Sequence, residues 1–490
     1  MSGDRTQDAE RNQAVISDLN PNLAVVIMAA GKGTRLKSKR PKVLHQIGGK
    51  PLLEHVIRAA TQVVSPDRIY VVIGHQADRV RETVAHTGVH FVNQPEQRGT
   101  GHAIQCARQA IAGYENLLVL SGDVPLIRPE TITRLWEFHR AQKAAMTLLT
   151  TRPVDATGYG RVLRTAPGEP EVEAIIEQKA LTPDQHRIGE INAGIYAFRT
   201  APLLAQLGKL TADNAHAELY LTDVASLLRG AGERVVALEA PDADEVLGAN
   251  TLAELASLDA ILRAATARRL MDAGVTIFQP ETCVLDSGVE VGPDTILEPF
   301  VQLRGSTRVG SDCLIRSFTV IEDCTLGDSV EIRQHCVLVQ STIENGAEIG
   351  PFARMRPGSQ IGENVHIGNF VEMKKTRLGK GAKANHFAYL GDTEIGPRSN
   401  IGAGTIVCNY DGVSKHKTHI GEGVFVGSNS TLVAPVAIHD GAYIGAASCI
   451  TRDVPADALA VGRARQVTKE GWAAARRRRR KDGAAPETGH

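Results

Sequence analysis

A glycine-rich segment with nearby cations follows the first apolar run of the chain. Residues 29–36 read AAGKGTRL, directly after the apolar residues 24–28, and a basic cluster at 39–42 comes next. Backbone N–H groups of such a loop at the end of a strand, together with cations, suit a phosphate group. The frame of a Walker A loop and the third glycine of a dinucleotide fingerprint are both missing. The pattern therefore predicts a polyphosphate site with Arg35 and Lys42 as its candidate cations; a solvated basic face is the alternative.

An acidic residue stands at the end of another apolar run. Asp123 follows residues 117–120 through Ser121-Gly122. A carboxylate at the end of a strand can hold Mg²⁺, a cation that prefers oxygen ligands. An ordinary turn aspartate is the alternative, because aspartate is common in turns.

Strand-like runs alternate with helical stretches between residues 21 and 250. This alternation predicts an α/β domain with a largely parallel sheet, whose ligands bind at the carboxyl ends of the strands. Residues 251–273 carry leucines at helical spacing and predict a long helix that connects two domains. The expected strands are residues 24–28, 69–73, 89–92, 117–120, 146–149 and 191–198, and the expected helices include 52–63 and 102–111.

An aliphatic residue recurs every six residues in the segment 274–465, and a glycine often follows it. This period is typical of a parallel β-helix, whose coils are stabilised by stacking on one another. The low aromatic content of 4% agrees with a narrow aliphatic interior. The repeat is clearest at Ile343, Ile349, Met355, Ile395, Ile401, Val407, Ile420, Val426, Leu432, Ile438, Ile444 and Ile450.

Two breaks in this period are expected to mark functional segments. Ile420 follows Val407 by thirteen positions instead of six, so CNYDGVSKHKTH should leave the coil as a loop. A second break is expected between Leu378 and Leu390, around His386. Loops that leave a regular scaffold often carry function.

The bulk composition limits the classes of function. The chain has 490 residues, with 55 basic and 55 acidic side chains, so it should hold several domains and no general nucleic-acid site. Seven scattered cysteines without a Cys-x-x-Cys pair, and no apolar run long enough for a bilayer, predict a cytoplasmic protein without membrane insertion. Residues 1–20 are expected to be a disordered tail, and 466–490 a basic flexible tail in which the arginines at 476–480 are solvated.

The order of the motifs indicates a family. AAGKGTRL with RPKVLH resembles the sugar-phosphate nucleotidyltransferases. With QPEQRGTGHA, SGDVPL, TGYGR, EINAGIYAF, VLGAN, MRPG, GNFVEMKK, YLGD, NIGAG, CNYDG and KEGW, the chain resembles the bifunctional bacterial N-acetylglucosamine-1-phosphate uridyltransferases/glucosamine-1-phosphate N-acetyltransferases. The resemblance extends from about Leu23 to Trp472.

The resemblance implies two reactions and their partners. Glucosamine 1-phosphate would be N-acetylated by acetyl-CoA, and N-acetylglucosamine 1-phosphate would then receive a uridylyl group from UTP with release of pyrophosphate. It also implies an α/β nucleotidyltransferase domain of Rossmann-like type, a left-handed β-helix, a homotrimer, and one or two Mg²⁺ ions at the uridylyl site.

The family's uridylyl site falls on residues spread over the first domain. Asn250 would join Asp123 as a metal ligand, and substrate phosphates would complete the octahedron. Gln94 suits a base edge, while Thr100 could also act as the N-cap of a helix. The implied contacts are Met28, Ala29, Ala30, Gly31, Lys42, Gln94, Gly99, Thr100, Ser121, Gly160, Glu177, Asn192 and Asn250.

The family's acetyl site falls on the repeat segment. His386 would be the general base, the role most often taken by histidine, and Glu372 is a candidate for orienting it. Arg356 and Lys374, on successive coils, would bind the sugar 1-phosphate; two solvent-exposed cations are the alternative. The implied sugar and acetyl contacts are Tyr389, Asn400, Asn409 and Tyr410, and the implied coenzyme contacts are Ser428, Ala446 and Arg463.

Two rival functions remain open from the sequence. One is a single-activity nucleotidyltransferase whose β-helix is structural or regulatory, and the other is a non-catalytic assembly scaffold. The first gives no reason for His386, Lys374 and the CNYDG loop. The second gives none for Arg35, Lys42 and Asp123.

Overall fold

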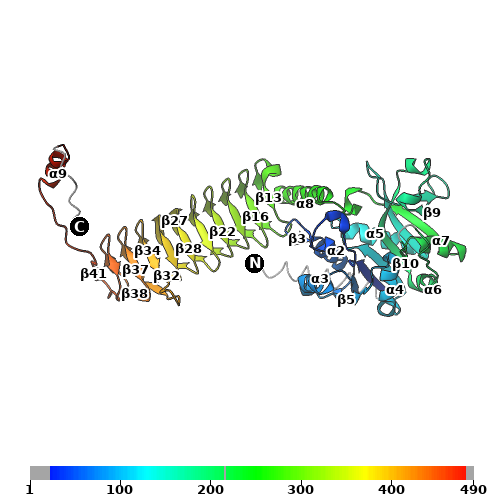
Figure 1. The fold of residues 1–490 in the computed structure, drawn as a ribbon, viewed down its shortest axis with the longest axis horizontal. Coiled ribbons are helices and arrows are strands. Elements are labelled where there is room, and N and C mark those ends of the chain that lie inside the picture. Colours follow the sequence, from blue (N-terminus) through cyan, green and yellow to red (C-terminus); the bar gives the residue numbers. More distant parts are fainter. Residues whose placement is uncertain (1–21, 215–216, 482–490) are drawn as a thin grey trace. The chain divides into compact units, whose positions relative to one another are not determined.

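The computed structural model describes residues 22–214 and 217–481, which form two compact units (Figure 1). The first unit ends at Thr266 and the second begins at Ala267. The expected tail at residues 1–20 and the last residues of the basic tail lie outside the described ranges.

The first unit is built on one mixed sheet. Its main path has the strand order β11-β7-β10-β6-β1-β4-β5, and β8 and β9 extend it beside β10. The strands are β1 Leu23–Met28, β4 Ile69–Ile73, β5 His90–Asn93, β6 Asn116–Ser121, β7 Met146–Thr151, β8 Arg161–Arg164, β9 Val172–Ile176, β10 Ile191–Arg199 and β11 Val235–Glu239.

The sheet is parallel except around β10 and the β8–β9 hairpin. β1 pairs in parallel with β4 and β6, and β7 pairs in parallel with β11. β10 is antiparallel to both β6 and β7. The chain reaches β10 from β7 through the β8–β9 hairpin, and antiparallel neighbours need no crossover helix. The expected α/β sheet, largely parallel, is confirmed, and its antiparallel part consists of β10 and the β8–β9 hairpin.

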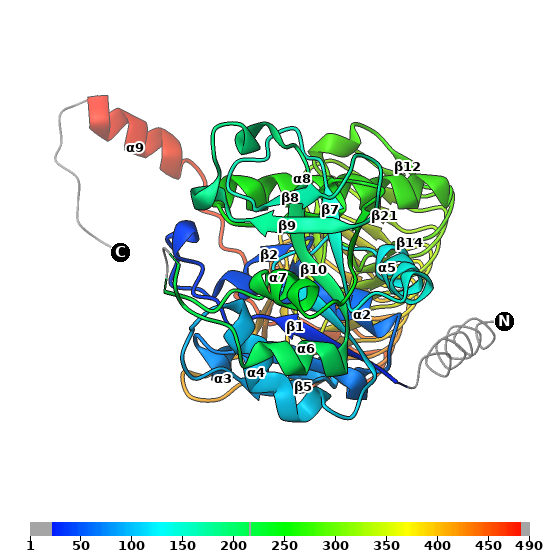
Figure 2. The same ribbon diagram turned by 90° about the vertical axis from the view of Figure 1, so that its right-hand side faces the viewer.

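Helices cover both faces of the sheet (Figure 2). Alternate residues of β1 pack on opposite faces: Val25 and Ile27 belong to one core, Ala24 and Val26 to the other. Burial on both faces explains why this strand is apolar throughout instead of alternating. The helices on one face are α2 Leu52–Thr61, α3 Ala77–Val84 and α5 Pro129–Gln142, and on the other α4 Thr100–Ile111, α6 Thr200–Leu207 and α7 Asp223–Gly230.

The connecting helix is α8, Leu252–Asp272. Its first turn carries a capping box, in which Thr251 Oγ1 accepts the N–H of Glu254 at 3.2 Å. In return Glu254 Oε2 accepts the N–H of Thr251 at 2.8 Å. The same oxygen accepts the N–H of Asn250 at 2.7 Å, so the start of α8 fixes the backbone of Asn250.

The second unit is a left-handed β-helix of short parallel strands. It has three sheets of 11, 10 and 9 strands, and each coil gives one strand to each sheet. We call them the first, second and third sheet; they begin at β12 Thr276–Ile277, β13 Val284–Leu285 and β14 Glu290–Val291. The last strand is β41 Leu459–Ala460. A typical coil consists of β24 Glu348–Ile349, β25 Arg354–Arg356 and β26 Gln360–Ile361.

The six-residue period describes the interior of this unit. The predicted aliphatic residues are buried and stack in register, as Ile349 does on Ile367 and Ile401 on Val426. The core is made of Ile, Val, Leu, Met, Cys and Ala side chains. The expected loop between Val407 and Ile420 is present, between β34 Ile406–Cys408 and β35 Thr418–Ile420.

The second expected break is wrong. Ala384, in β30 Lys383–His386, points inward between Leu378 and Leu390 and stacks between Ile367 and Ile401. The coil is therefore regular there, and a small alanine had hidden the repeat. His386 ends β30 at a normal corner.

Part of the expected flexible tail is helical. The basic run forms α9, Trp472–Lys481, in which the guanidinium of Arg476 lies 5.1 Å from the centroid of the Trp472 ring. Alanine and arginine both favour helix, which explains the difference from the expectation. Within residues 22–214 and 217–481, no helix has the length and apolar character needed to cross a bilayer.

Candidate functional site

The loops after β1 and β6 meet at the first candidate site. Met28 and Ser121 are register partners at the carboxyl ends of these strands. A cavity of about 620 Å³ opens beside them. Most of the predicted uridylyl residues line it: Met28, Ala29, Ala30, Gly31, Arg35, Lys42, Gln94, Gly99, Thr100, Ser121, Asp123 and Asn250. Gly160, Glu177 and Asn192 are not among its lining residues.

Four of these side chains form one polar cluster. Asn250 Oδ1 accepts hydrogen bonds from Arg35 Nη2 at 2.6 Å and from Lys42 Nζ at 2.9 Å. Lys42 Nζ also forms an ion pair with Asp123. The Asp123 carboxylate and the Asn250 amide oxygen, from the two residues predicted to bind metal, therefore both contact the Lys42 ammonium group. A single cation at that position can contact both oxygens.

This cluster offers part of the ligand set that a metal ion would need. One carboxylate and one amide oxygen suit Mg²⁺ in type, but octahedral coordination needs more oxygens. In the described part of the chain, no group of three or more His, Cys, Asp or Glu side chains could hold a metal ion alone. The donor set therefore fits a Mg²⁺ ion that arrives with, or is completed by, substrate phosphates.

The segment Gln94–Thr100 forms one wall of the cavity. Gln94 is buried, and its Nε2 donates to the carbonyl of Gly99 at 3.1 Å. Gly99 is the N-cap of α4 with φ 104°, and a Cβ there would lie 2.5 Å from the carbonyl oxygen of Leu219, so only glycine fits. The alternative N-cap role of Thr100 is wrong, because its Oγ1 accepts the N–H of Leu221 at 2.9 Å.

The three remaining predicted residues adjoin one another: Gly160 directly precedes β8, Glu177 directly follows β9, and Asn192 lies on β10. The N–H of Asn192 donates to the carbonyl of Gly160 at 2.9 Å. The Oε2 atom of Glu177 would lie 3.7 Å from a Cβ on Gly160. Asn192 Oδ1 accepts the N–H of Gly194 at 3.1 Å, and Ser121 Oγ donates to the carbonyl of Gly194 at 3.0 Å. Ser121 thus links this group to the cavity.

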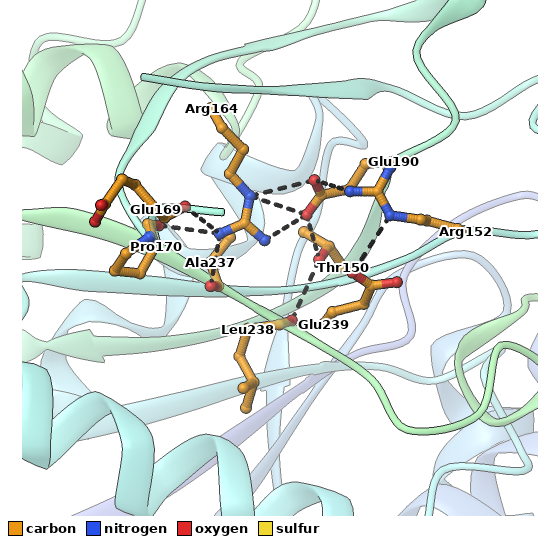
Figure 3. Close-up of polar contacts among 9 residues, drawn as sticks. All are labelled: Thr150, Arg152, Arg164, Glu169, Pro170, Glu190, Ala237, Leu238 and Glu239. Carbon is orange, nitrogen blue, oxygen red and sulfur yellow. Dashed lines mark hydrogen bonds and ion pairs between the residues drawn. The ribbon is translucent and has the colours of Figure 1, made fainter. Parts of the chain in front are cut away.

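A buried carboxylate behind these residues was missed by sequence reasoning (Figure 3). Glu190 is 2% exposed and precedes β10. It accepts hydrogen bonds from Arg164 Nη2 at 2.5 Å, Arg152 Nη2 at 3.0 Å and Thr150 Oγ1 at 2.7 Å. Burial by itself would raise the pKa of Glu190, but the hydrogen bonds from Arg164 and Thr150 outweigh it and the pKa is lowered. The only signal in the sequence was a charged residue directly before an apolar strand.

Arg164 ties this carboxylate to the neighbouring strands. Its Nη1 donates to the carbonyls of Glu169 and Pro170 at 3.2 Å and of Ala237 at 3.0 Å. Because Ala237 lies on β11 and Arg164 on β8, the guanidinium joins the β8–β9 hairpin to the sheet. Glu190 and Arg164 together hold the strands that carry Gly160 and Asn192.

The predicted base of the second unit has a partner on the adjacent coil. His386 Nδ1 lies 2.6 Å from Oδ1 of Asn369, at the end of β27 His366–Asn369. The expectation that Glu372 orients His386 is corrected, because Glu372 Oε1 accepts a hydrogen bond from Arg356 at 3.3 Å instead. His386 is exposed, at a corner between the first and second sheets.

Cations gather at the corner between the second and third sheets. Arg356 and Lys374 are register partners at the ends of β25 and β28 Glu372–Lys374. Lys415, from the extruded loop, joins them: its ammonium group beside that of Lys374 lowers the pKa of Lys374. Sequence reasoning missed Lys415, although its place in that loop was a usable signal. Three cations this close suit a dianionic phosphate.

The predicted sugar and acetyl residues lie on the coils and the loop that follow Lys374. Asn409 is buried, and its Nδ2 donates to Asp392 Oδ2 at 2.5 Å. A Cβ on Gly391 would lie 2.7 Å from Tyr389 Oη and 2.8 Å from Asn409 Nδ2, so this glycine lets both side chains approach. Tyr410 is exposed in the loop. Asn400 begins β33 Asn400–Ile401, paired with Lys383 at the opposite end of the strand from His386.

The predicted coenzyme residues lie at the same corner as His386, on later coils. Ser428 follows β36 Phe425–Val426, and Ala446 follows β39 Tyr443–Ile444; both strands belong to the first sheet. Arg463 Nη1 donates to the carbonyl of Ala446 at 3.0 Å. The structure therefore gathers these three residues along one edge.

Comparisons with known proteins agree with this division. The MobA-like NTP transferase domain matches residues 25–273, and the bacterial transferase hexapeptide repeat matches 340–375 and 417–452. The Bifunctional protein GlmU of Koribacter versatilis is 61% identical over 463 residues, which cover 94% of this chain and 99% of that relative. Proteins of the same name from Solibacter usitatus and Pelobacter propionicus are 51% and 46% identical, over 93% and 92% of this chain and 98% of each relative.

These relatives span both units, and a nucleotidyltransferase domain is followed by hexapeptide repeats of acyltransferase type in the same order. The chain therefore belongs to the family of bifunctional GlmU proteins, enzymes with a nucleotidyltransferase and an acyltransferase activity.

Proposed function

We propose that the first unit transfers a uridylyl group from UTP to N-acetylglucosamine 1-phosphate and releases pyrophosphate. The second unit, in this proposal, uses acetyl-CoA to N-acetylate glucosamine 1-phosphate and so supplies the substrate of the first. The observation that carries the proposal is the convergence of Arg35 and Lys42 on Asn250, beside Asp123, at the mouth of a cavity of about 620 Å³.

Catalysis in the first unit consists of positioning and charge neutralisation. A phosphate oxygen of the sugar phosphate attacks the α-phosphorus of UTP, and the bond to pyrophosphate breaks. Arg35 and Lys42 face the charge that develops on the phosphoryl oxygens and the leaving group. Asp123 and Asn250 would hold Mg²⁺, which neutralises triphosphate charge when bound. Gln94 reads the base, and Gly160, Glu177 and Asn192 contact the acetamido sugar.

Catalysis in the second unit relies on His386. The Nδ1 atom of His386 is hydrogen-bonded to Asn369, which leaves Nε2 to act as the base. This Nε2 atom takes the proton of the sugar amine while the amine nitrogen attacks the thioester carbonyl. The tetrahedral intermediate then expels the coenzyme thiolate, which takes up a proton. Arg356, Lys374 and Lys415 hold the 1-phosphate, and Tyr389, Asn400, Asn409 and Tyr410 hold the sugar and acetyl group. Ser428, Ala446 and Arg463 contact the coenzyme.

The proposal includes a cytoplasmic homotrimer, which the resemblance implies. The rival function, a nucleotidyltransferase with a purely structural β-helix, gives no reason for the cation cluster of Arg356, Lys374 and Lys415 or for the His386–Asn369 contact.

Assays of the two half-reactions with two single variants test the proposal. Asp123→Ala should abolish Mg²⁺-dependent uridylyl transfer and leave acetyl transfer at the wild-type rate. His386→Ala should lower the kcat of acetyl transfer by about 10²–10⁴ and leave uridylyl transfer unchanged. A wild-type protein with only one of the activities would contradict the proposal, and so would a variant that loses both.

A further inference from the structure

A second cavity of the first unit lies beside the segment that follows Asp123. Its volume is about 460 Å³, a size typical of small-molecule sites. It is bounded by α2, the segment 125–129, the short helix η7 Asp244–Val246 and α8. All of its lining residues precede Thr266, so they belong to one compact unit, and none of them lines the uridylyl cavity. This cavity is therefore distinct from the site described above.

The wall of this second cavity is mostly apolar. Ile127 is buried, whereas Ile261 on α8 is 37% exposed and borders the opening. Pockets lined by hydrophobic side chains and a small number of polar groups are typical of sites for organic ligands. The larger apolar residues of the wall are Pro125, Leu126, Ile127, Pro129, Ile261 and Leu262.

A buried carboxylate with an unsatisfied oxygen belongs to the same wall. Glu245 is 2% exposed, and its Oε2 accepts a hydrogen bond from Thr131 Oγ1 at 2.5 Å. Among the described residues, no group donates a hydrogen bond to Oε1 of Glu245. The guanidinium of Arg128 reaches this oxygen only as an ion pair, with Nη1 3.5 Å away. Because buried polar atoms nearly always have a hydrogen-bond partner, Oε1 calls for a donor from outside the chain.

The charges of the lining favour a cationic donor. Three carboxylates and two guanidinium groups line the cavity: Asp242, Asp244, Glu245, Arg58 and Arg128. Both guanidinium groups are already paired, since Arg58 Nε donates to Glu54 at 3.1 Å and Arg128 Nη2 donates to Asp242 at 3.1 Å. Glu54 lies outside the lining, so negative charge is in excess within it. Burial lowers the pKa of His55, the remaining titratable residue of the lining, and its imidazole adds no positive charge at neutral pH.

We propose that this cavity binds an amphipathic amine, a small organic ligand with a protonated amino group and an apolar body. The amino group donates a hydrogen bond to Oε1 of Glu245, and the body lies against Leu126, Ile127 and Ile261. An anionic ligand would meet the excess of carboxylates. A metal ion would lack ligands, because no group of three or more His, Cys, Asp or Glu side chains in the described ranges could hold one.

The cavity also adjoins the packing that holds the two predicted metal ligands. Leu126 and Leu262 line the cavity and pack against a small core that contains Ala249. The N–H of Ala249 donates to the carbonyl of Asp123 at 3.1 Å, and Asn250 follows Ala249 directly. A ligand between the two leucines therefore presses on the contacts that set the distance from Asp123 to Asn250. Binding should raise the Mg²⁺ concentration that uridylyl transfer requires, a consequence that rests on the proposed function.

Titrations of the full chain with 2-phenylethylamine test the amine site. Saturation-transfer NMR at pH 7 measures its Kd, and 2-phenylethanol is the uncharged control of the same size. The amine should bind more tightly by about 10–100-fold, as expected for a hydrogen bond to a charged group. Glu245→Gln should remove this preference. Equal Kd values of the amine and the alcohol for the wild-type chain would overturn the inference.

Two neighbouring alanines of α8 cover the case in which Glu245→Gln disturbs the fold. Ala264 and Ala265 are both exposed, but only Ala265 lines the cavity. Ala265→Phe should fill the opening and abolish binding of the amine, while Ala264→Phe should keep the wild-type Kd. Binding retained in the Ala265→Phe chain, or no binding to wild type at about 10 mM amine, would overturn the inference.

Assays of uridylyl transfer distinguish this inference from the proposed function. Saturating amine should raise the half-saturating Mg²⁺ concentration by about fivefold or more in wild type and Ala264→Phe, and not in Ala265→Phe. Acetyl transfer should be unchanged. A chain that binds the amine but transfers no uridylyl group would overturn the proposed function and leave the amine site standing. An unchanged Mg²⁺ requirement with the amine bound would overturn the coupling to Asp123 and Asn250.

Discussion

The Nδ1 atom of His386 lies 2.6 Å from Oδ1 of Asn369, its register partner on the preceding coil. An amide oxygen can only accept, so in the neutral imidazole the proton resides on Nδ1 and the lone pair on Nε2. The contact therefore selects the tautomer that a base needs and fixes the plane of the ring.

We expect Asn369→Ala to lower the kcat of acetyl transfer by about fivefold, because one hydrogen bond contributes about 1 kcal/mol. The KM values for both substrates should stay near wild type, since Asn369 orients the base and does not hold substrate. Gln360→Ala, on the third sheet, is the control and should change neither quantity. A wild-type kcat in the Asn369 variant would contradict the orienting role.

Lys415 should contribute to phosphate binding in the acetyl reaction. Lys415→Met should raise the KM for glucosamine 1-phosphate by about 10–100-fold, as expected for a hydrogen bond to a charged group of about 1.5–3 kcal/mol. It should also raise the pKa of Lys374, because Lys415 is the largest cause of its lowering. Lys417→Met is a control from the same loop, since Lys417 pairs with Glu394 at 3.7 Å. Equal KM values in the two variants would contradict the assignment.

Strands and coils with a regular spacing of apolar residues could be predicted from the sequence. The side-chain contacts between these elements could not be predicted as well. The coils were visible because Ile349, Ile367 and their equivalents repeat at six residues. The partner of His386 was not visible, because Asn369 lies 17 residues away rather than 18. The inward residues Met373 and Leu378 are five positions apart instead of six. This coil is therefore one residue shorter than a coil of three full hexads, so the partner on the next coil cannot be found at a fixed spacing of 18.

The first unit shows the same limit. The loop at 29–36 and Asp123 were predicted to lie at strand ends, and parallel pairing of β1 with β6 brings them together. The burial of Glu190 could not be predicted, because it depends on β7, β8 and β11 converging behind β10. The reversed direction of β10 was equally hidden, since an apolar run gives no direction.

Glu190 should matter to the uridylyl reaction through its hold on β10. Glu190→Gln leaves the Arg164 guanidinium without its carboxylate, and breaking a buried pair in this way costs about 3–5 kcal/mol. We expect the first unit to lose stability and the KM for N-acetylglucosamine 1-phosphate to rise, with the KM for UTP near wild type. Acetyl transfer should be unchanged.

A surface pair provides the control for this prediction. Glu171 and Arg234 are 35% and 43% exposed and join β11 to the turn before β9. Glu171→Gln should change the free energy of unfolding by no more than about 1 kcal/mol and leave both KM values unchanged. A rise in the KM for UTP equal to that for the sugar phosphate would contradict the positioning role of Glu190.

His139 should make the stability of the first unit depend on pH. The side chain is 1% exposed, stacks on Trp136 at 6.0 Å and lies 2.8 Å from Thr147 Oγ1 through Nδ1. Burial, with a smaller contribution from the charge of Arg199, lowers the pKa of His139 from 6.5 to about 4. Between these two values the unfolded chain binds one more proton than the folded chain. The free energy of unfolding should therefore fall by about 1.4 kcal/mol for each pH unit below 6.5, until the pH approaches the folded pKa.

Urea unfolding of wild type and His139→Leu between about pH 4.5 and 7 measures this contribution. Of the two tryptophans, Trp136 is buried and Trp472 is exposed, so the change in fluorescence reports mainly on the first unit. Leucine does not titrate, so the variant should lose stability less steeply than wild type as the pH falls, whatever its stability at pH 7. Other titrating groups are common to both proteins, and the difference between the two slopes isolates His139. Parallel slopes would show that His139 does not control acid unfolding of this unit.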